Sequence, residues 1–229
     1  MIKFITLAIL RFFDYFYQKK MMNFLKKKIY KIDVFIDVGA HKGETIRLFN
    51  DNFEINKSYS FEASPLTFKI LQKKLDKIKR KYNKTQIFLE NLALGSENKK
   101  IYLKHLNESS SSTIKSINSN SKYFKKKFFF LNKYNKKNFY KEIEVEQILL
   151  EEFAKKNKIN EIDFIKIDTE GYELEVLKGS ENILNKVNFV LFEHHYDDMI
   201  VKNYFFSDIH LFLLKNNFKK KFFFLNKYN

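Results

Sequence analysis

Residues 35–45 read FIDVGAHKGET, a short apolar run that contains Asp37 and is followed by a turn with Gly39 and Gly43. The whole chain has only 5 glycines, so two in one turn indicate a local requirement of the backbone. A glycine turn between a strand and a helix lets the backbone approach a nucleotide-like ligand closely. The stretch holds two of the three glycines of a dinucleotide fingerprint, so it needs support from its context.

A second motif, SFEASP at residues 60–65, supplies that context. Glu62 follows the turn by about 20 residues, at the expected end of the second strand, where a carboxylate can bind the ribose hydroxyls of a nucleotide. Pro65 is the only proline of the chain, and the first turn of a helix tolerates proline because its missing donor has no partner there. Strand, acidic tip, proline and helix form one consistent unit.

A third motif, IDFIKIDTEGYE, occupies residues 162–173. It predicts a buried strand that delivers Asp168 and Glu170 to its carboxyl end, where open α/β sheets bind their ligands. Glu170 also has a structural explanation, because the helix dipole stabilises a carboxylate in the first turn of the next helix. Asp168 has no such explanation and is the stronger functional candidate.

A further strand, VLFEHH at residues 190–195, ends beside the same crevice. Adjacent side chains on a strand point to opposite faces, so His194 and His195 are not expected to bind one ion. We therefore expect a functional role for one histidine and no metal site.

Short apolar runs alternate with helical periods over most of the chain, which predicts an α/β domain with a mainly parallel sheet. Strands are expected over residues 34–38, 59–61, 87–89, 164–167 and 189–192, helices over 66–81, 147–156 and 172–184, and extra strands over 101–103 and 143–145.

The pattern differs in three places. Residues 1–30 read as an amphipathic helical extension with a basic rim, which lies either on an anionic membrane or on the surface of the domain formed by residues 31–229. Residues 107–142 read as a low-complexity insert or lid. The twelve residues 124–135 recur identically as 218–229, and we expect a final strand over 222–225.

Composition narrows the class of protein. The chain has no cysteine, which excludes disulfides, thiolate zinc sites and cysteine nucleophiles. Its net charge of +16 suits an anionic partner, but Lys, Asn, Ile and Phe are all abundant together, so residue bias explains the charge as well. No apolar stretch approaches the roughly 20 residues that a membrane-spanning helix requires. We expect a cytoplasmic protein, either free or peripheral to a membrane.

The motifs together resemble the FkbM-type family of S-adenosylmethionine-dependent methyltransferases. The resemblance rests on the segments already quoted, on NLALGSEN at residues 91–98, and above all on IDFIKIDTEGYELEVLKGSENIL at 162–184. It spans residues 34–195 and implies a Rossmann-like class I methyltransferase fold. It also implies methyl transfer to an oxygen, commonly a hydroxyl of a sugar or another small-molecule or glycan acceptor.

The resemblance also implies a set of cofactor-binding residues. Asp37, Gly39 and Gly43 would line the methionine and ribose end of S-adenosylmethionine, and Glu62 would bind the ribose. The adenine edge would meet Asn91 and Ala93. His41 lies in the same glycine turn, where the family commonly has a small or amide residue.

A sugar hydroxyl is a poor nucleophile near neutral pH, so a positioned base would help the transfer. By position we expect Asp168 to be this base, with His194 second and Glu170 as a further candidate.

Two other classes of protein remain open. An NAD-dependent oxidoreductase shares the strand, glycine and acid geometry, but normally has the full three-glycine fingerprint. A basic nucleic-acid-binding protein fits the charge, although a phosphate-driven binder usually relies on arginine and this chain has few. We do not expect nucleic acid to be a partner.

Overall fold

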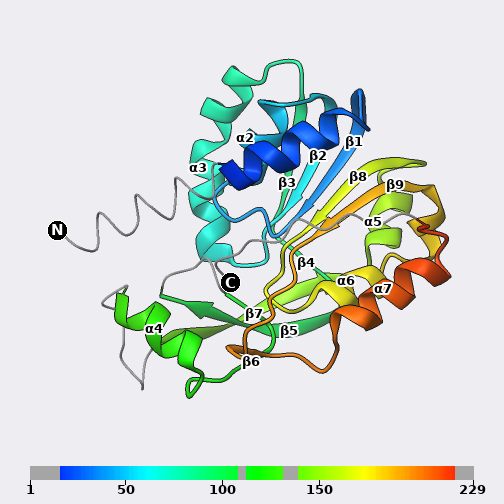
Figure 1. Ribbon diagram of the computed structural model, residues 1–229. Coiled ribbons are helices and arrows are strands. Elements are labelled where there is room, and N and C mark those ends of the chain that lie inside the picture. Colours follow the sequence, from blue (N-terminus) through cyan, green and yellow to red (C-terminus); the bar gives the residue numbers. More distant parts are fainter. Residues whose placement is uncertain (1–15, 108–111, 131–138, 220–229) are drawn as a thin grey trace.

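The computed structural model describes residues 16–107, 112–130 and 139–219, and Figure 1 shows their arrangement. A five-stranded sheet lies at the centre, in the order β3–β2–β1–β8–β9, and each neighbouring pair is parallel. Its strands are β1 (Lys31–Val38), β2 (Glu54–Phe61), β3 (Gln86–Glu90), β8 (Ile162–Ile167) and β9 (Val187–Phe192). The fold is Rossmann-like, as the sequence predicted. The strand order reverses between β1 and β8, which is where doubly wound sheets bind their ligands.

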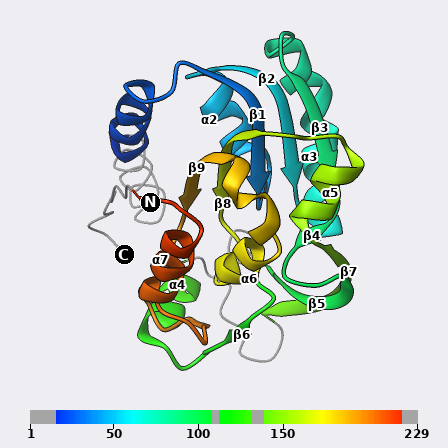
Figure 2. The ribbon, with the colours of Figure 1, turned by 90° about the vertical axis from the view of Figure 1, so that its right-hand side faces the viewer.

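Helices cover both faces of the sheet (Figures 1 and 2). One face packs against a helix at residues 16–26, α2 (Glu44–Asn50) and α3 (Pro65–Lys81). The other face packs against α5 (Leu150–Lys156), α6 (Glu173–Lys178), the 3₁₀ helix η1 (Glu181–Lys186) and α7 (Phe206–Lys215). The predicted helix over 172–184 is divided, because α6 ends at Gly179 and η1 follows. Likewise β7 continues to Ile148, so the predicted helix over 147–156 begins later.

A second, smaller sheet lies next to the carboxyl ends of the central strands. It consists of β4 (Ala93–Leu94), β7 (Tyr140–Ile148) and β5 (Lys99–Leu106), with β5 and β7 antiparallel. The strands predicted over 101–103 and 143–145 are the central parts of β5 and β7. A two-residue strand β6 (Ser116–Ile117) pairs with β10 (Ile200–Val201).

The described parts of the predicted insert, residues 107–142, have regular structure. They contain β6, the helix α4 (Lys122–Phe130) and the first residues of β7. Phe124 is fully buried and packs edge-on against Phe139, with 4.9 Å between ring centroids. Low complexity in this segment therefore does not mean an absence of packing. Whether any part of it acts as a lid stays a prediction.

The two ends of the chain are described only in part. Met21, Met22 and Leu25 of the helix at residues 16–26 are buried against the central sheet, which favours the alternative that this part of the extension packs on its own domain. The final strand predicted over 222–225 lies outside the described residues. Within the part of the chain that the structure describes, no helix is long and apolar enough to span a membrane.

Phe35 in β1 provides a test of how the sheet packs against its helices. Its ring stacks on Phe49 of α2 at 4.4 Å and contacts Phe164 of β8 at 6.0 Å, with no exposed surface. We expect Phe35→Ala to lower the free energy of unfolding by about 3–5 kcal/mol, because it removes buried contacts and leaves a cavity. Urea unfolding measures this, with Tyr102→Ala as the control, since Tyr102 is 59% exposed. Equal losses in the two variants would contradict the packing.

Candidate functional site

The site lies where the central strands end, at the point where their order reverses. Asp37 occupies the end of β1, and Glu62, Asp168 and Glu193 each follow directly after β2, β8 and β9. The carboxyl ends of parallel strands share one edge of the sheet, so four acidic residues converge there. Three of these four were predicted from the sequence, and Glu193 was not.

The glycine turn after β1 is held by close backbone contacts. The N–H groups of Gly39 and Ala40 both donate to the carbonyl oxygen of Phe61, at 2.9 Å. Gly39 has φ +87°, and a Cβ atom there would lie 1.9 Å from the carbonyl oxygen of Asp168. Only glycine fits this position, because both the conformation and the space exclude a side chain. The turn thereby brings the ends of β1, β2 and β8 together.

Glu62 is nearly buried, with 8% of its surface exposed. Its two carboxylate oxygens accept hydrogen bonds from the backbone N–H groups of His41 (2.8 Å) and Ser64 (2.9 Å). Burial raises the pKa of Glu62 to about 7, against the opposing effect of these two donors. His41 itself has φ +47°, an uncommon conformation for a non-glycine residue that fixes its N–H toward Glu62. The Glu62 side chain therefore joins the glycine turn to the tip of β2.

The two residues predicted at the adenine edge differ in what they can offer. The side-chain amide of Asn91 donates to the carbonyl oxygens of Glu62 (2.8 Å) and Ala63 (3.2 Å), so it supports the tip of β2. Ala93 is 4% exposed and packs in the small sheet with Leu103. Ala93 would therefore contact a ligand through its backbone.

Asp37 is the most unusual group of the site. It has no exposed surface, and neither carboxylate oxygen has a hydrogen-bond partner among the described residues. Burial raises its pKa to about 7, although the charge of Lys166 acts in the opposite direction. A buried carboxylate without a partner destabilises a fold. Its presence at a strand tip is expected where a ligand completes its hydrogen bonds.

Lys166 is the cation of this edge. In the register of the parallel strands β1 and β8, Lys166 is the residue opposite Asp37. Its ammonium group lies 2.9 Å from Oδ2 of Asp168. Burial acts to lower the pKa of Lys166, but the charges of Asp168 and Asp37 raise it above the ordinary value. Burial conversely acts to raise the pKa of Asp168, and Lys166 holds it below the ordinary value. Lys166 was not predicted as a site residue, although a lysine within the apolar run FIKI is a visible signal in the sequence.

The loop after β8 is shaped by Glu173, which is 1% exposed. One oxygen of its carboxylate accepts hydrogen bonds from the backbone N–H groups of Thr169 (3.1 Å) and Gly171 (3.0 Å). The other oxygen accepts a hydrogen bond from the hydroxyl of Tyr204. Glu170 lies in this loop with φ +51°, so it does not start the helix as the structural explanation required. Its carboxyl group is directed to the site instead.

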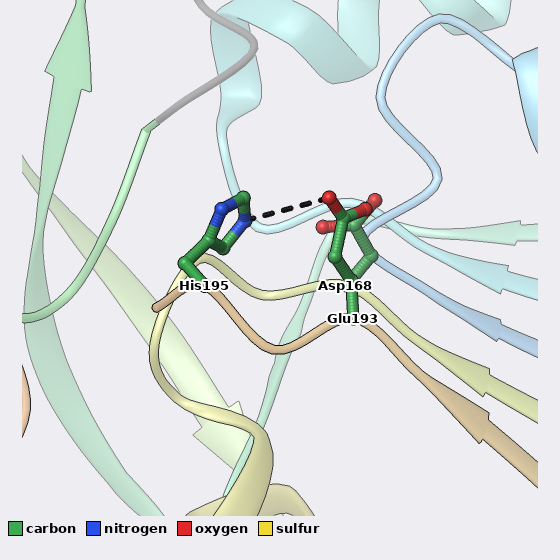
Figure 3. Close-up of side chains that lie close together, drawn as sticks. All are labelled: Asp168, Glu193 and His195. Carbon is green, nitrogen blue, oxygen red and sulfur yellow. Dashed lines mark ion pairs between the residues drawn. The ribbon is translucent and has the colours of Figure 1, made fainter. Parts of the chain in front are cut away.

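His195 lies among acidic side chains. Its Nε2 atom is 3.3 Å from Oε2 of Glu170 and 3.7 Å from Oε1 of Glu193, and its Nδ1 atom is 3.8 Å from Oδ2 of Asp197. Figure 3 shows the imidazole directed at the carboxylates of Asp168 and Glu193. Burial acts to lower the pKa of His195, but the surrounding carboxylates raise it. Burial raises the pKa of Glu170 to about 8.

His194 has a different environment from its neighbour. Its ring packs against the rings of Tyr196, Tyr204 and Phe206, with centroids 4.9, 6.0 and 5.7 Å away. Burial lowers its pKa to about 4, and the charge of Lys202 adds to this effect. The structure thus brings His195, rather than the predicted His194, beside the acidic strand tips. The two side chains diverge because they are adjacent, as expected for neighbours at the end of a strand.

The sequence of the chain matches a family model described as the methyltransferase FkbM domain, over residues 37–220. The match covers most of the chain and includes all the strand tips of the site. The protein is therefore a member of the FkbM methyltransferase family, as its motifs suggested.

Two individual proteins are similar to parts of the chain. Hexuronic acid methyltransferase AglP of Haloferax volcanii is 44% identical over 45 residues, which is 20% of this chain and 19% of that protein. The crystal structure of a methyltransferase FkbM from Methylobacillus flagellatus gives a TM-score of 0.44 at 14% identity, over 68% of this chain and 30% of that one. The chain thus spans less than a third of either relative. The fold assignment rests on the strand order and the family match.

The buried carboxyl group of Asp37 should make the stability of the protein depend on pH. Its pKa is raised in the folded state, so folding is favoured at low pH and this contribution is lost as pH rises from about 4 to about 7. We expect Asp37→Asn to gain stability relative to the natural protein between pH 4 and pH 8, by up to about 4 kcal/mol at roughly 1.4 kcal/mol per pKa unit.

Urea unfolding at the two pH values measures this change, and any constant cost of burying the amide cancels between them. Asp76→Asn, at an exposed position of α3, is the matched control and should show no such change. If both variants follow the same pH dependence as the natural protein, the Asp37 carboxyl group is not buried without a partner.

Proposed function

We propose that this protein transfers a methyl group from S-adenosylmethionine to a hydroxyl group of a sugar or glycan. The observation that carries the proposal is the family match over residues 37–220. The matched region includes a strand-tip site with a fully buried carboxylate that has no hydrogen-bond partner among the described residues. Membership of the family supports methyltransferase activity. The donor, the oxygen target and the acceptor are the proposed parts.

The residues of the site fit this donor. The amino group and the sulfonium of S-adenosylmethionine are cationic, and Asp37 offers two oxygens that no hydrogen bond from the described part of the chain occupies. The backbone at Gly39 is partly exposed, and a glycine in this turn lets a ligand approach closely. Glu62 retains acceptor capacity for ribose hydroxyls, because each carboxylate oxygen has two lone pairs and each accepts one backbone N–H. Asn91 and the backbone at Ala93 would lie toward the adenine.

S-adenosylmethionine supplies an activated methyl group on a sulfonium sulfur. The task of the protein is then to align the acceptor hydroxyl, which is worth several powers of ten in rate when the geometry is held. Asp168 lies at the strand tip with one oxygen on Lys166 and its side chain 30% exposed. Lys166 keeps its pKa low, so Asp168 is a weak base. We therefore assign Asp168 to binding and orienting the hydroxyl, in place of the base expected from sequence.

A sugar acceptor is supported by the curated relative, which is a hexuronic acid methyltransferase. An open hollow of about 480 Å³ lies beside the first described helix and is lined by residues of that helix, namely Phe16, Lys19, Lys20, Asn23, Phe24 and Lys27. Burial raises the pKa of Tyr17 in this helix, and the charge of Glu193 adds to the effect. Lysines there would suit an acceptor with a carboxylate or phosphate group. Contact of this helix with an anionic membrane stays a prediction.

Cofactor binding tests the first part of the proposal. We expect S-adenosylmethionine to bind with measurable heat, and we expect NADH not to bind. Glu62→Gln should weaken the binding by tenfold or more, because the amide cannot accept from both ribose hydroxyls while it meets two backbone donors. Glu90→Gln, at the tip of the neighbouring strand β3, is the matched control. Binding of NADH instead would favour the oxidoreductase alternative.

Turnover tests the second part. Sugars with and without a carboxylate are incubated with the protein and S-adenosylmethionine, and the product is identified by the mass gain of one methyl group. We expect Asp168→Asn to lower turnover by more than about tenfold while the affinity for the cofactor is unchanged, since alignment acts in the transition state. Turnover that stays within tenfold would mean that Asp168 does not orient the acceptor.

A further inference from the structure

Three side chains at the edge of the site lie close enough together to bind one ligand. The proposed methyl transfer does not require them to act as a group. Asp168, Glu193 and His195 each offer one donor atom, and these atoms lie within 4.8 Å of one another. They come from the ends of the neighbouring strands β8 and β9, and Figure 3 shows them directed to a common point. The Nε2 atom of His195 is buried and has no hydrogen-bond partner among the described residues, although it lies within ion-pair distance of Glu170 and Glu193.

We propose that Asp168, Glu193 and His195 bind one divalent transition-metal cation. Imidazole nitrogen suits zinc, iron and nickel, and carboxylate oxygen suits magnesium and manganese. A set of one nitrogen and two oxygens therefore favours Mn²⁺, Fe²⁺ or Zn²⁺ over Ca²⁺. Three protein ligands leave coordination positions open, as catalytic sites do.

The distances are close to those of a metal site. Donor atoms bound at about 2.1 Å on opposite sides of one ion lie about 4.2 Å apart, and neighbouring donors lie closer. Oε1 of Glu193 is already 3.7 Å from Nε2 of His195. The side chain of Glu193 is 48% exposed, so it can turn without disturbing the core. The donor atoms would have to move closer together to bind one ion, and the exposed side chain of Glu193 allows such a movement.

A second observation is the unbalanced negative charge of this edge. Asp37 and Asp168 share the ammonium group of Lys166, and the two buried oxygens of Asp37 still lack a hydrogen bond from any described residue. Glu170, Glu193 and Asp197 add three more carboxyl groups around His195. Lys202, whose ammonium group donates to the carbonyl oxygen of His195, is a second cation at this edge. Buried charges require partners, so a metal cation would offset a cost that these two lysines leave. The competing explanation is that protonated His195 is itself the partner.

The proposal departs from the expectation, drawn from the sequence, that the chain has no metal site. His194 and His195 were not expected to bind one ion together, and this set does not require them to, because His194 packs among aromatic rings and takes no part. Resting on the proposed function, a cation here would also activate the acceptor. The cation would lower the pKa of an acceptor hydroxyl bound to it, so the proton could pass to solvent water and Asp168 would not have to act as the base.

The test is direct binding of Mn²⁺ to the full chain after dialysis against a chelator. We expect one ion per chain, seen as loss of the free Mn²⁺ signal in electron paramagnetic resonance and as heat in calorimetry. Glu193→Gln and His195→Gln should each weaken binding by tenfold or more. Glu142→Gln, an exposed carboxylate on β7, is the matched control and should leave it unchanged.

Zn²⁺ is titrated in parallel, and saturable binding of either ion at these residues supports the proposal. If neither ion binds, or if the two site variants bind like the control, protonated His195 is the partner of the carboxylates and the proposal is wrong. Circular dichroism verifies that each variant is folded, and the metal-induced rise in melting temperature of the natural protein gives a readout without variants. Calorimetry with S-adenosylmethionine separates failure of the metal site from failure of the proposed function.

Discussion

The close approach of Gly39 to the carbonyl oxygen of Asp168 is the constraint on which the site depends. It sets the separation of β1 and β8 at the point where the strand order reverses, and it leaves no room for any side chain. Because the strands meet so closely, Asp37 and Asp168 lie near one lysine, Lys166, which neutralises only part of their charge. The electrostatics of the site thus follow from a backbone contact.

Such an arrangement opposes stability. Asp37 has no exposed surface and Glu62 has 8%, and burial raises the pKa of both to about 7. Each would be more stable as a neutral group, so the folded protein retains them at a cost. Buried groups of this kind are expected where a ligand supplies the missing partners. The hydrophobic core on both faces of the sheet, built around Phe35, Phe61 and Phe164, is what makes this cost tolerable.

The parallel sheet, its carboxyl edge and three of its four acidic tips could be predicted from the sequence, because alternation of apolar runs and the glycine turn depend on local chemistry. The role of His195 could not, because which of the two adjacent histidines faces the carboxylates depends on tertiary packing, in which the ring of His194 lies against Tyr204 and Phe206. Glu193 could not be predicted as a site residue, because a carboxylate directly after a strand is usually a solvated surface residue. Local sequence also does not determine secondary structure where tertiary packing differs. Phe124 lies in a helix, whereas Phe218, which begins the identical second copy, does not.

The charge of the whole chain gives the site a further property. The net charge is +16, yet six carboxyl groups of the described residues lie at the strand-tip edge, near Lys166, Lys202 and His195. At long range the positive exterior attracts anions and repels cations, and salt limits this field to about 8 Å at physiological ionic strength. An anionic acceptor would thus be drawn toward the lysines of the first helix, whereas a cation must be held by short-range contacts with the carboxylates. Opposite charges in two parts of the molecule can therefore hold the anionic acceptor and the cationic ligands apart.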